Sequence, residues 1–125
     1  MFVLIPEMFV IENGDSDSAA GPEGIVHQFL CHRVRYLISY RRILQLTASY
    51  SVRTVNPDDF TVTNDFRFDD IVRLVPNESD PTAFTIELRV NKGTEKLVPY
   101  FYTSEYRTEV LCRLHEFLWK AKVLK

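Results

Sequence analysis

The last third of the chain, from Phe84 to Lys125, constrains the fold more than any other stretch. Between Phe84 and Val90, apolar and polar side chains alternate, which is the period of a strand with one buried and one solvated face. The tripeptide Asn91-Lys92-Gly93 then predicts a turn, and Leu97 to Tyr102 predicts a second apolar strand that returns along the first. The stretch therefore begins with a β-hairpin.

A helix is predicted directly after this hairpin. Thr103 or Ser104 is suited to cap its N-terminus, and Glu105 falls in its first turn. The apolar residues that follow recur at helical spacing and form one stripe. They are Val110, Leu111, Leu114, Phe117, Leu118 and Ala121. We expect this stripe to lie on a sheet or across the mouth of a barrel.

Short strands are predicted upstream of this stretch as well. They cover Ile25–Val34, Tyr40–Thr47, Tyr50–Val55, Phe60–Thr63 and Ile71–Val75. Seven short strands followed by one terminal helix is the element order of the pleckstrin-homology-like (PH-like) fold. We therefore predict an α+β, mainly β domain: a PH-like, seven-stranded, partly open antiparallel barrel capped by a C-terminal α-helix.

The domain is expected to span residues 25–125, preceded by a flexible acidic extension at residues 1–24. Glu12 to Gly24 is rich in Gly, Ser, Asp and Ala and has almost no bulky apolar residue, which is typical of a mobile linker. Met1 to Ile11 is apolar and is either a strand broken by Pro6 or a sticky tail.

Charge and hydropathy narrow the classes of partner. The net charge of −2 creates no overall field toward nucleic acid or membrane, so we expect no nucleic-acid partner, and any attraction must be local. The apolar runs are too short for a transmembrane segment, and Met1 to Val10 carries Glu7 and has no basic leader. We expect a cytoplasmic protein with reduced thiols.

Neither catalysis nor a cofactor is predicted, because nucleophile, phosphate-loop and metalloprotease motifs are lacking from the sequence. Cys31, His32, Cys112 and His115 are ligand types for zinc. Neighbouring residues of a strand point to opposite faces, however, so Cys31 and His32 cannot easily converge on one ion. We therefore predict no metal site.

Basic residues cluster around one predicted hairpin, and they are the first candidate site. They are Arg33, Arg35, Arg41 and Arg42, with Tyr36 between them. The planar guanidinium donates two parallel hydrogen bonds to a phosphate, so the hairpin could bind one. The alternative is a solvated strand face on which the arginines pair with nearby carboxylates.

Trp119 is the second candidate, for a protein partner. On a helical wheel it lies away from the apolar stripe, near Cys112 and His115. It is either a docking patch for another domain or a cover over the lower edge of the barrel.

Several short motifs resemble one family. Arg41 to Leu46, Asn56-Pro57 and Phe60 to Asn64 are similar to the N-terminal segment of a large endosomal J-domain protein. This is the receptor-mediated endocytosis 8 type, or DnaJ subfamily C member 13 class. The similarity continues through Asp70-Ile71, Phe84–Arg89 and Tyr102–Leu111.

The resemblance implies a PH-like module that binds phosphatidylinositol 3-phosphate. Such a module would help to hold a larger chaperone-recruiting protein on early endosomes, near sorting nexins and the WASH complex. The family carries Lys-His-Ser-Trp-Arg-Gly before Tyr-Lys-Arg; here Tyr40-Arg41-Arg42 matches the last three, and Tyr36 stands where the Trp would be. The chain has no His-Pro-Asp triplet, so it is not itself a J-domain.

Two hypotheses follow from these observations. In the first, the arginines bind a phosphoinositide or another anionic lipid of a peripheral membrane, while Tyr36, Leu37 and Ile38 enter the membrane interface. In the second, the chain is a protein-interaction module of the PH, PTB or EVH1 type. A peptide would then add to a strand edge beside the helix, or Trp119 would dock a neighbouring domain.

Overall fold

The computed structural model describes residues 24–89 and 96–123. Its strands are β1 (Ile25–Arg35), β2 (Ile38–Thr47), β3 (Ser51–Val55), β4 (Val62–Arg67), β5 (Ile71–Pro76), β6 (Ala83–Arg89) and β7 (Leu97–Thr103). A 3-10 helix, η2 (Phe68–Asp70), connects β4 to β5, and α2 (Arg107–Val123) follows β7. The predicted extension at residues 1–24 lies, except for Gly24, outside the described residues, as does the predicted turn at residues 91–93.

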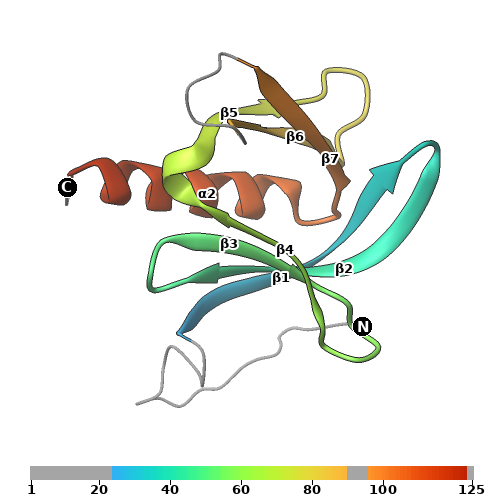
Figure 1. Cartoon of the computed structure of the whole chain (residues 1–125). Coiled ribbons are helices and arrows are strands. Elements are labelled where there is room, and N and C mark those ends of the chain that lie inside the picture. The colour runs from blue at the N-terminus through green and yellow to red at the C-terminus, as the bar shows by residue number, and fades with distance from the viewer. Residues whose placement is uncertain (1–23, 90–95, 124–125) are drawn as a thin grey trace.

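The strands form one antiparallel sheet in the order β4-β3-β2-β1-β7-β6-β5. The sheet is strongly bent, and α2 lies between its two halves (Figure 1). Seven antiparallel strands with one C-terminal helix confirm the predicted fold class.

The core forms where the bent sheet meets the helix. Leu44, Leu46, Val52 and Ile86 are fully buried within the sheet. The predicted helical stripe covers them, with Val110, Leu114, Phe117 and Ala121 buried and Leu111 and Leu118 partly buried. Phe117 is the centre of an aromatic cluster, because its ring lies 5.7 Å from those of His27 and Phe68 and 6.0 Å from that of Tyr50.

Polar contacts fix the start of the helix. Helix α2 begins at Arg107, so Glu105 lies in the turn before it rather than in its first turn. The hydroxyl of Ser104 accepts a hydrogen bond from the Tyr106 N–H at 3.0 Å and donates to the Leu30 carbonyl at 2.8 Å. The guanidinium of Arg107 donates to three carbonyls around the β5–β6 connection, those of Asn77, Asp80 and Ala83. The helix is therefore tied to both halves of the sheet.

The fourth strand begins and ends later than the sequence predicts. The prediction for Phe60–Thr63 is wrong in its bounds, since β4 runs from Val62 to Arg67 and shares only Val62 and Thr63 with it. Phe60 belongs to the β3–β4 connection, with a φ of 61°. Two side chains of the connection delay the start of the strand. The Asn56 Oδ1 accepts a hydrogen bond from the Asp58 N–H, and the Asp59 carboxylate accepts one from the Thr61 N–H. Asp69 and Asp70, which precede β5, belong to η2.

The β1–β2 hairpin is longer than predicted. Arg35 pairs with Ile38, so only Tyr36 and Leu37 form the turn, with φ values of 50° and 68°. Pairing of β1 with β7 ends at Val34, and pairing of β2 with β3 begins at Ile43. We term residues 35–42 the finger. These residues pair only between β1 and β2, without a partner in β3 or β7, and they project from the barrel on the right of Figure 1.

Candidate functional site

The strand register sorts the four predicted arginines onto two faces. Residues directly opposite each other in an antiparallel pair share a face, and Cys31 pairs with Arg42. Cys31 is a buried core residue, so this face is the inner one. Arg33 pairs with Tyr40 and Arg35 with Ile38 on the same face. We term Arg33, Arg35, Tyr40 and Arg42 the inner arginine face.

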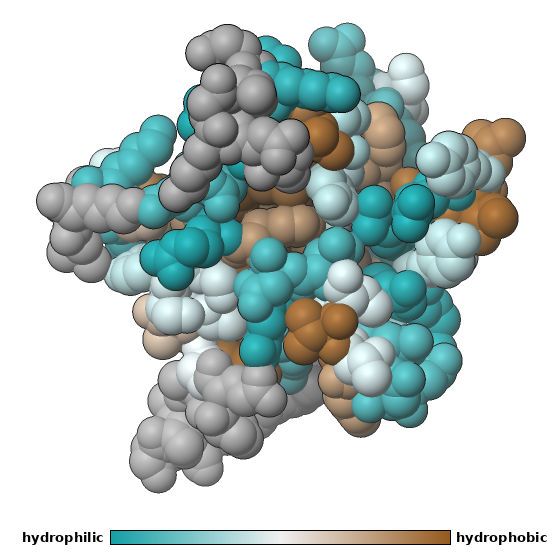
Figure 2. Space-filling view, in the orientation of Figure 1, coloured by the Kyte–Doolittle hydropathy of each residue, from teal (hydrophilic) through white to brown (hydrophobic). Residues whose placement is uncertain are grey.

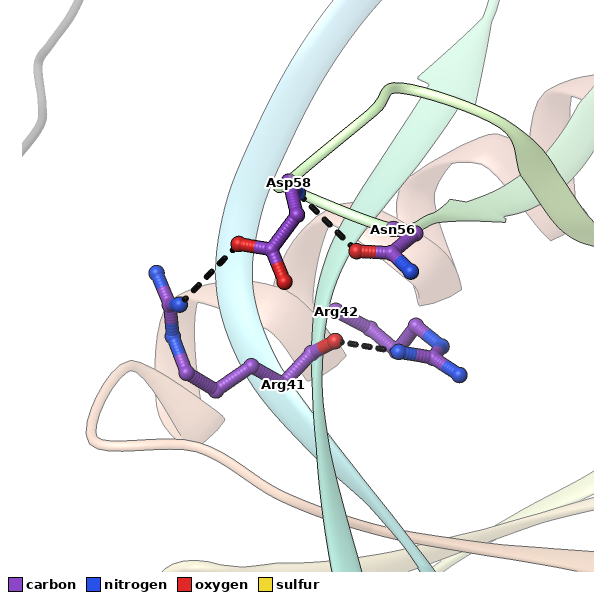
Figure 3. A network of polar contacts seen from close by, with 4 residues as sticks. All are labelled: Arg41, Arg42, Asn56 and Asp58. Carbon is purple, nitrogen blue, oxygen red and sulfur yellow. Dashed lines mark hydrogen bonds and ion pairs between the residues drawn. The ribbon is translucent and has the colours of Figure 1, made fainter.

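Arg41 is separated from the other three arginines. It lies opposite His32 on the outer face, and its guanidinium is 3.7 Å from the carboxylate of Asp58. Figure 3 shows the side chains of Arg41 and Arg42 leaving β2 in opposite directions. Both members of the Arg41–Asp58 pair are largely exposed, so the pair stabilises the fold little, but it partly neutralises Arg41.

Arg33 is fixed at the base of the inner arginine face. It is half-buried, donates from Nη1 to the Asn64 Oδ1 at 2.9 Å, and has its Cζ 4.2 Å from the centre of the Tyr100 ring. Its Nε is buried and has no partner among the residues that the structure describes. An anion or a water molecule there would satisfy this donor.

Tyr102 supplies a second buried donor beside Arg33. It lies opposite Arg33 in the β1–β7 pair, and its hydroxyl has no partner within the described parts of the chain. Burial raises the pKa of Tyr102, while the positive charges of Arg33 and Arg42 act in the other direction. The hydroxyl therefore stays protonated at neutral pH and can donate to an acceptor.

The two remaining guanidinium groups of the inner arginine face are more accessible. Arg35 is exposed and Arg42 half-buried. Each has its Cζ 5.5 Å from an aromatic ring, that of Tyr36 for Arg35 and that of Tyr40 for Arg42. The Arg42 Nη1 also donates to the Arg41 carbonyl at 2.6 Å. Stacking on rings limits side-chain freedom, so less entropy is lost when such an arginine binds an anion.

The end of the finger is apolar and strained. Tyr36 is 86% exposed, Leu37 is 99% exposed, and Ile38 is also exposed. Apolar surface reaches the right-hand edge of Figure 2, where Figure 1 places the end of the finger. A left-handed backbone costs an L-residue about 1–2 kcal/mol. Tyr36 and Leu37 both adopt it, in a turn type that favours Asn and Gly.

Trp119 lies on the outer surface of α2. It is 66% exposed, so it does not cover the edge of the barrel. Cys112 and His115 are also exposed on this helix. Cys31 is buried instead, and burial raises the pKa of its thiol to about 12, which keeps it neutral and unreactive. Within residues 24–89 and 96–123, no cluster of His, Cys, Asp or Glu could hold a metal ion.

Four residues around the inner arginine face were not predicted as site residues from the sequence. They are Tyr40, Asn64, Tyr100 and Tyr102. The spacing of Tyr100 and Tyr102 was a usable signal, because residues two apart in a strand share a face. Asn64 had no such signal, since it belongs to the strand that was misplaced.

A comparison with protein families decides the relationship of the chain. Residues 29–121 match the DNAJ protein RME-8 N-terminal domain. The chain belongs to this family. The RME-8 match spans every described strand except the start of β1, together with most of α2, and it confirms the resemblance seen in the short motifs. A search of curated proteins finds no match.

Solved structures support the PH-like fold of this RME-8 domain. A C-terminal domain of an unknown protein from Leishmania infantum is 14% identical, with a TM-score of 0.64 over 82% of this chain and 94% of that one. The DH/PH fragment of PDZRHOGEF in complex with human RhoA is 10% identical, with a TM-score of 0.63 over 77% and 29%. The Slm1-PH domain in complex with inositol-4-phosphate is 7% identical, with a TM-score of 0.58 over 77% and 94%.

A membrane-spanning helix is not found in the described part of the chain.

Proposed function

We propose that this RME-8 N-terminal domain is a non-catalytic module that binds the phosphorylated headgroup of an anionic membrane lipid. One observation carries the proposal: Arg33, Arg35 and Arg42 share one face of a hairpin whose projecting end exposes Tyr36 and Leu37. Cationic side chains beside a protruding apolar side chain are suited to a lipid bilayer, whose headgroups are anionic and whose interior is apolar.

Each residue has a distinct role in this proposal. Arg35 and Arg42 contact the phosphates, and Arg33 positions the base of the site while its Nε remains available to an anion. Tyr36 and Leu37 enter the membrane interface. Arg41 adds charge from the outer face, and its pairing with Asp58 reduces this contribution.

The energy of this contact limits what it can do alone. Each basic residue near an anionic surface contributes about 1 kcal/mol, so these four arginines give a weak, salt-sensitive attachment. The RME-8 family and the inositol phosphate bound to the Slm1-PH neighbour support a phosphoinositide as the lipid. Within this proposal the lipid is phosphatidylinositol 3-phosphate, as the family resemblance implies, and the domain is one of several contacts that hold a larger protein on early endosomes.

Vesicle flotation tests the proposal. The purified domain is floated with phosphatidylcholine vesicles that contain either phosphatidylinositol 3-phosphate or phosphatidylserine at equal total charge, at low and at physiological salt. Selective flotation with the phosphoinositide is expected, and it should be lost in Arg42→Glu. A folded domain that floats with neither lipid at low salt would refute lipid binding.

A protein partner is the second candidate, favoured by the exposure of Trp119. The PDZRHOGEF neighbour, whose DH/PH fragment is in complex with RhoA, shows that a fragment with this fold occurs in a protein complex. Strand addition is less suited to β5, because its register shifts between Ile71 and Arg73 and it ends in Pro76. Trp119→Ala should abolish capture of such a partner and leave flotation unchanged.

A further inference from the structure

The β3–β4 connection exposes an aromatic side chain at a strained position. Phe60 is 70% exposed and has a φ of 61°. A bulky L-residue in the left-handed region is uncommon, and such strain persists mainly where the surroundings impose it or where function requires it. Phe60 therefore combines two unfavourable features, an exposed apolar ring and a strained backbone.

Hydrogen bonds within the connection hold Phe60 in this position. Its N–H donates to the Asn56 carbonyl at 2.7 Å, and the Asn56 N–H donates to the Thr61 carbonyl at 2.9 Å. The Asp59 carboxylate accepts from the N–H and the hydroxyl of Thr61 at 3.1 and 2.8 Å. A closed connection of this kind presents the ring outward with little freedom to fold back.

The connection lies at the same end of the sheet as the finger. Since β3 runs antiparallel to β2, the chain leaves β3 toward the finger, and the Asp58–Arg41 pair joins the two at 3.7 Å. In Figure 1 the finger projects at the upper right and the β3–β4 connection at the lower right, so the two are separate points. The exposed apolar side chains of Leu37 and Phe60 therefore belong to two separate projections at the same end of the sheet.

We propose that Phe60 is a second point of insertion into the lipid bilayer, beside Leu37 at the end of the finger. This rests on the proposed lipid function and adds to it, because two separated points fix the orientation of the domain on the membrane. Both points are convex. A fluid bilayer accepts convex apolar points without a matching pocket, whereas a protein partner would need a complementary cavity for each.

The carboxylates of the connection set the depth of insertion. Asp58 is paired with Arg41, while hydrogen bonds from Thr61 lower the pKa of Asp59 and keep it charged. A charged carboxylate stays at the level of the headgroups, so only the ring of Phe60 enters the membrane interface. Insertion at this position is therefore shallow.

A tryptophan reporter tests the depth directly, because the chain has a single tryptophan. Phe60→Trp is made in a Trp119→Phe background and mixed with phosphatidylcholine vesicles that contain phosphatidylinositol 3-phosphate. The lipids are brominated either near the headgroup or near the chain end, and attachment is measured separately by sedimentation. Val72→Trp in the same background is the matched control, since Val72 is exposed on β5.

The expected result is a blue-shifted emission that the shallow bromine quenches more than the deep one, with neither change in the control. Phe60→Ala should weaken attachment roughly tenfold, and Val72→Ala should not. Attached protein whose introduced tryptophan at position 60 stays unquenched would overturn the proposal and leave the lipid function standing. Absence of attachment for the wild-type domain would overturn both.

Discussion

The carboxylate of Asp58 lies 3.7 Å from the guanidinium of Arg41, on the outer face of the finger. Arg42, the next residue, belongs to the inner arginine face, where it stacks against Tyr40. Two arginines that are adjacent in the sequence therefore differ in electrostatic surroundings. Their contributions to the proposed lipid binding can be measured separately, through Asp58 for Arg41 and through substitution of Arg42 itself.

Asp58→Asn should strengthen binding to anionic vesicles. The change removes a negative charge from the end that we propose faces the membrane, and it releases Arg41. A unit charge near an anionic surface is worth about 1 kcal/mol, or roughly fivefold in affinity. Vesicle sedimentation at fixed salt measures the effect. Glu78→Gln is the matched control, because it removes the same charge in the β5–β6 connection. Equal affinities of wild type and Asp58→Asn would contradict this role of Asp58.

Tyr36→Asn with Leu37→Gly should stabilise the fold and weaken membrane binding at once. Asn-Gly is the preferred pair for a two-residue turn with positive φ, so the free energy of unfolding should rise by about 1–2 kcal/mol. The exposed apolar end is lost in the same step, and flotation should fall. Urea unfolding and flotation give the two results. A variant that is more stable and floats as well as wild type would exclude membrane insertion of the finger.

Arg33→Met should destabilise the domain by about 1–3 kcal/mol, because it removes the hydrogen bond to Asn64 and the stacking on Tyr100. Arg35→Met is the control, since Arg35 is exposed, and its effect should stay within about 0.5 kcal/mol. Urea unfolding measures both. If Arg33→Met unfolds at the same urea concentration as wild type but no longer floats with vesicles, Arg33 contacts the ligand directly and does not act by positioning the site.

Stability should depend on His27 in mildly acidic solution. Burial and the nearby Arg113 and Lys120 lower the pKa of His27, with Glu116 opposing them. The unfolded chain therefore binds a proton more readily, so stability is full above pH 6.5 and falls as the pH drops below it. Thermal unfolding at pH 7.5 and 5.5 should show this loss in wild type and less of it in His27→Phe. Acidic groups with lowered pKa values, such as Asp59 and Asp80, act at lower pH.

A control separates this effect from general titration. His32→Gln removes a histidine that is exposed on the outer face, and it should lose as much stability on acidification as wild type. An equal pH dependence in His27→Phe and wild type would show that His27 does not couple protonation to the packing of α2.

The sequence predicted the fold where hydrophobic periodicity was strong. Phe84, Ile86 and Leu88 alternate with polar residues and are buried in β6 as expected, and the stripe from Val110 to Ala121 packs on the core. Periodicity failed at β4, because Phe60 looks like a strand residue. Its N–H instead donates to the Asn56 carbonyl, and the side chains of Asn56 and Asp59 accept hydrogen bonds from the backbone of the same connection.

The arrangement of the candidate site depended on a register that the sequence does not specify. Tyr36 and Leu37 lack the Gly or Asn that would mark a two-residue turn, so residues 35–39 were expected outside the strands. Once that turn is known, the register places Arg33 opposite Tyr40, and it places Arg41 on the other face of the hairpin from the remaining arginines. The arginine cluster was thus predictable as a composition, whereas its division between two faces was not.

A titration of the isotopically labelled domain with inositol 1,3-bisphosphate, followed by amide chemical shifts, tests the central claim most directly. This molecule is the headgroup of phosphatidylinositol 3-phosphate without its lipid chains, so it reports the inner arginine face alone. The largest shifts are expected at Arg33, Arg35, Tyr40 and Arg42. Shifts confined to α2 around Trp119, or none at millimolar ligand, would contradict a headgroup site on the finger.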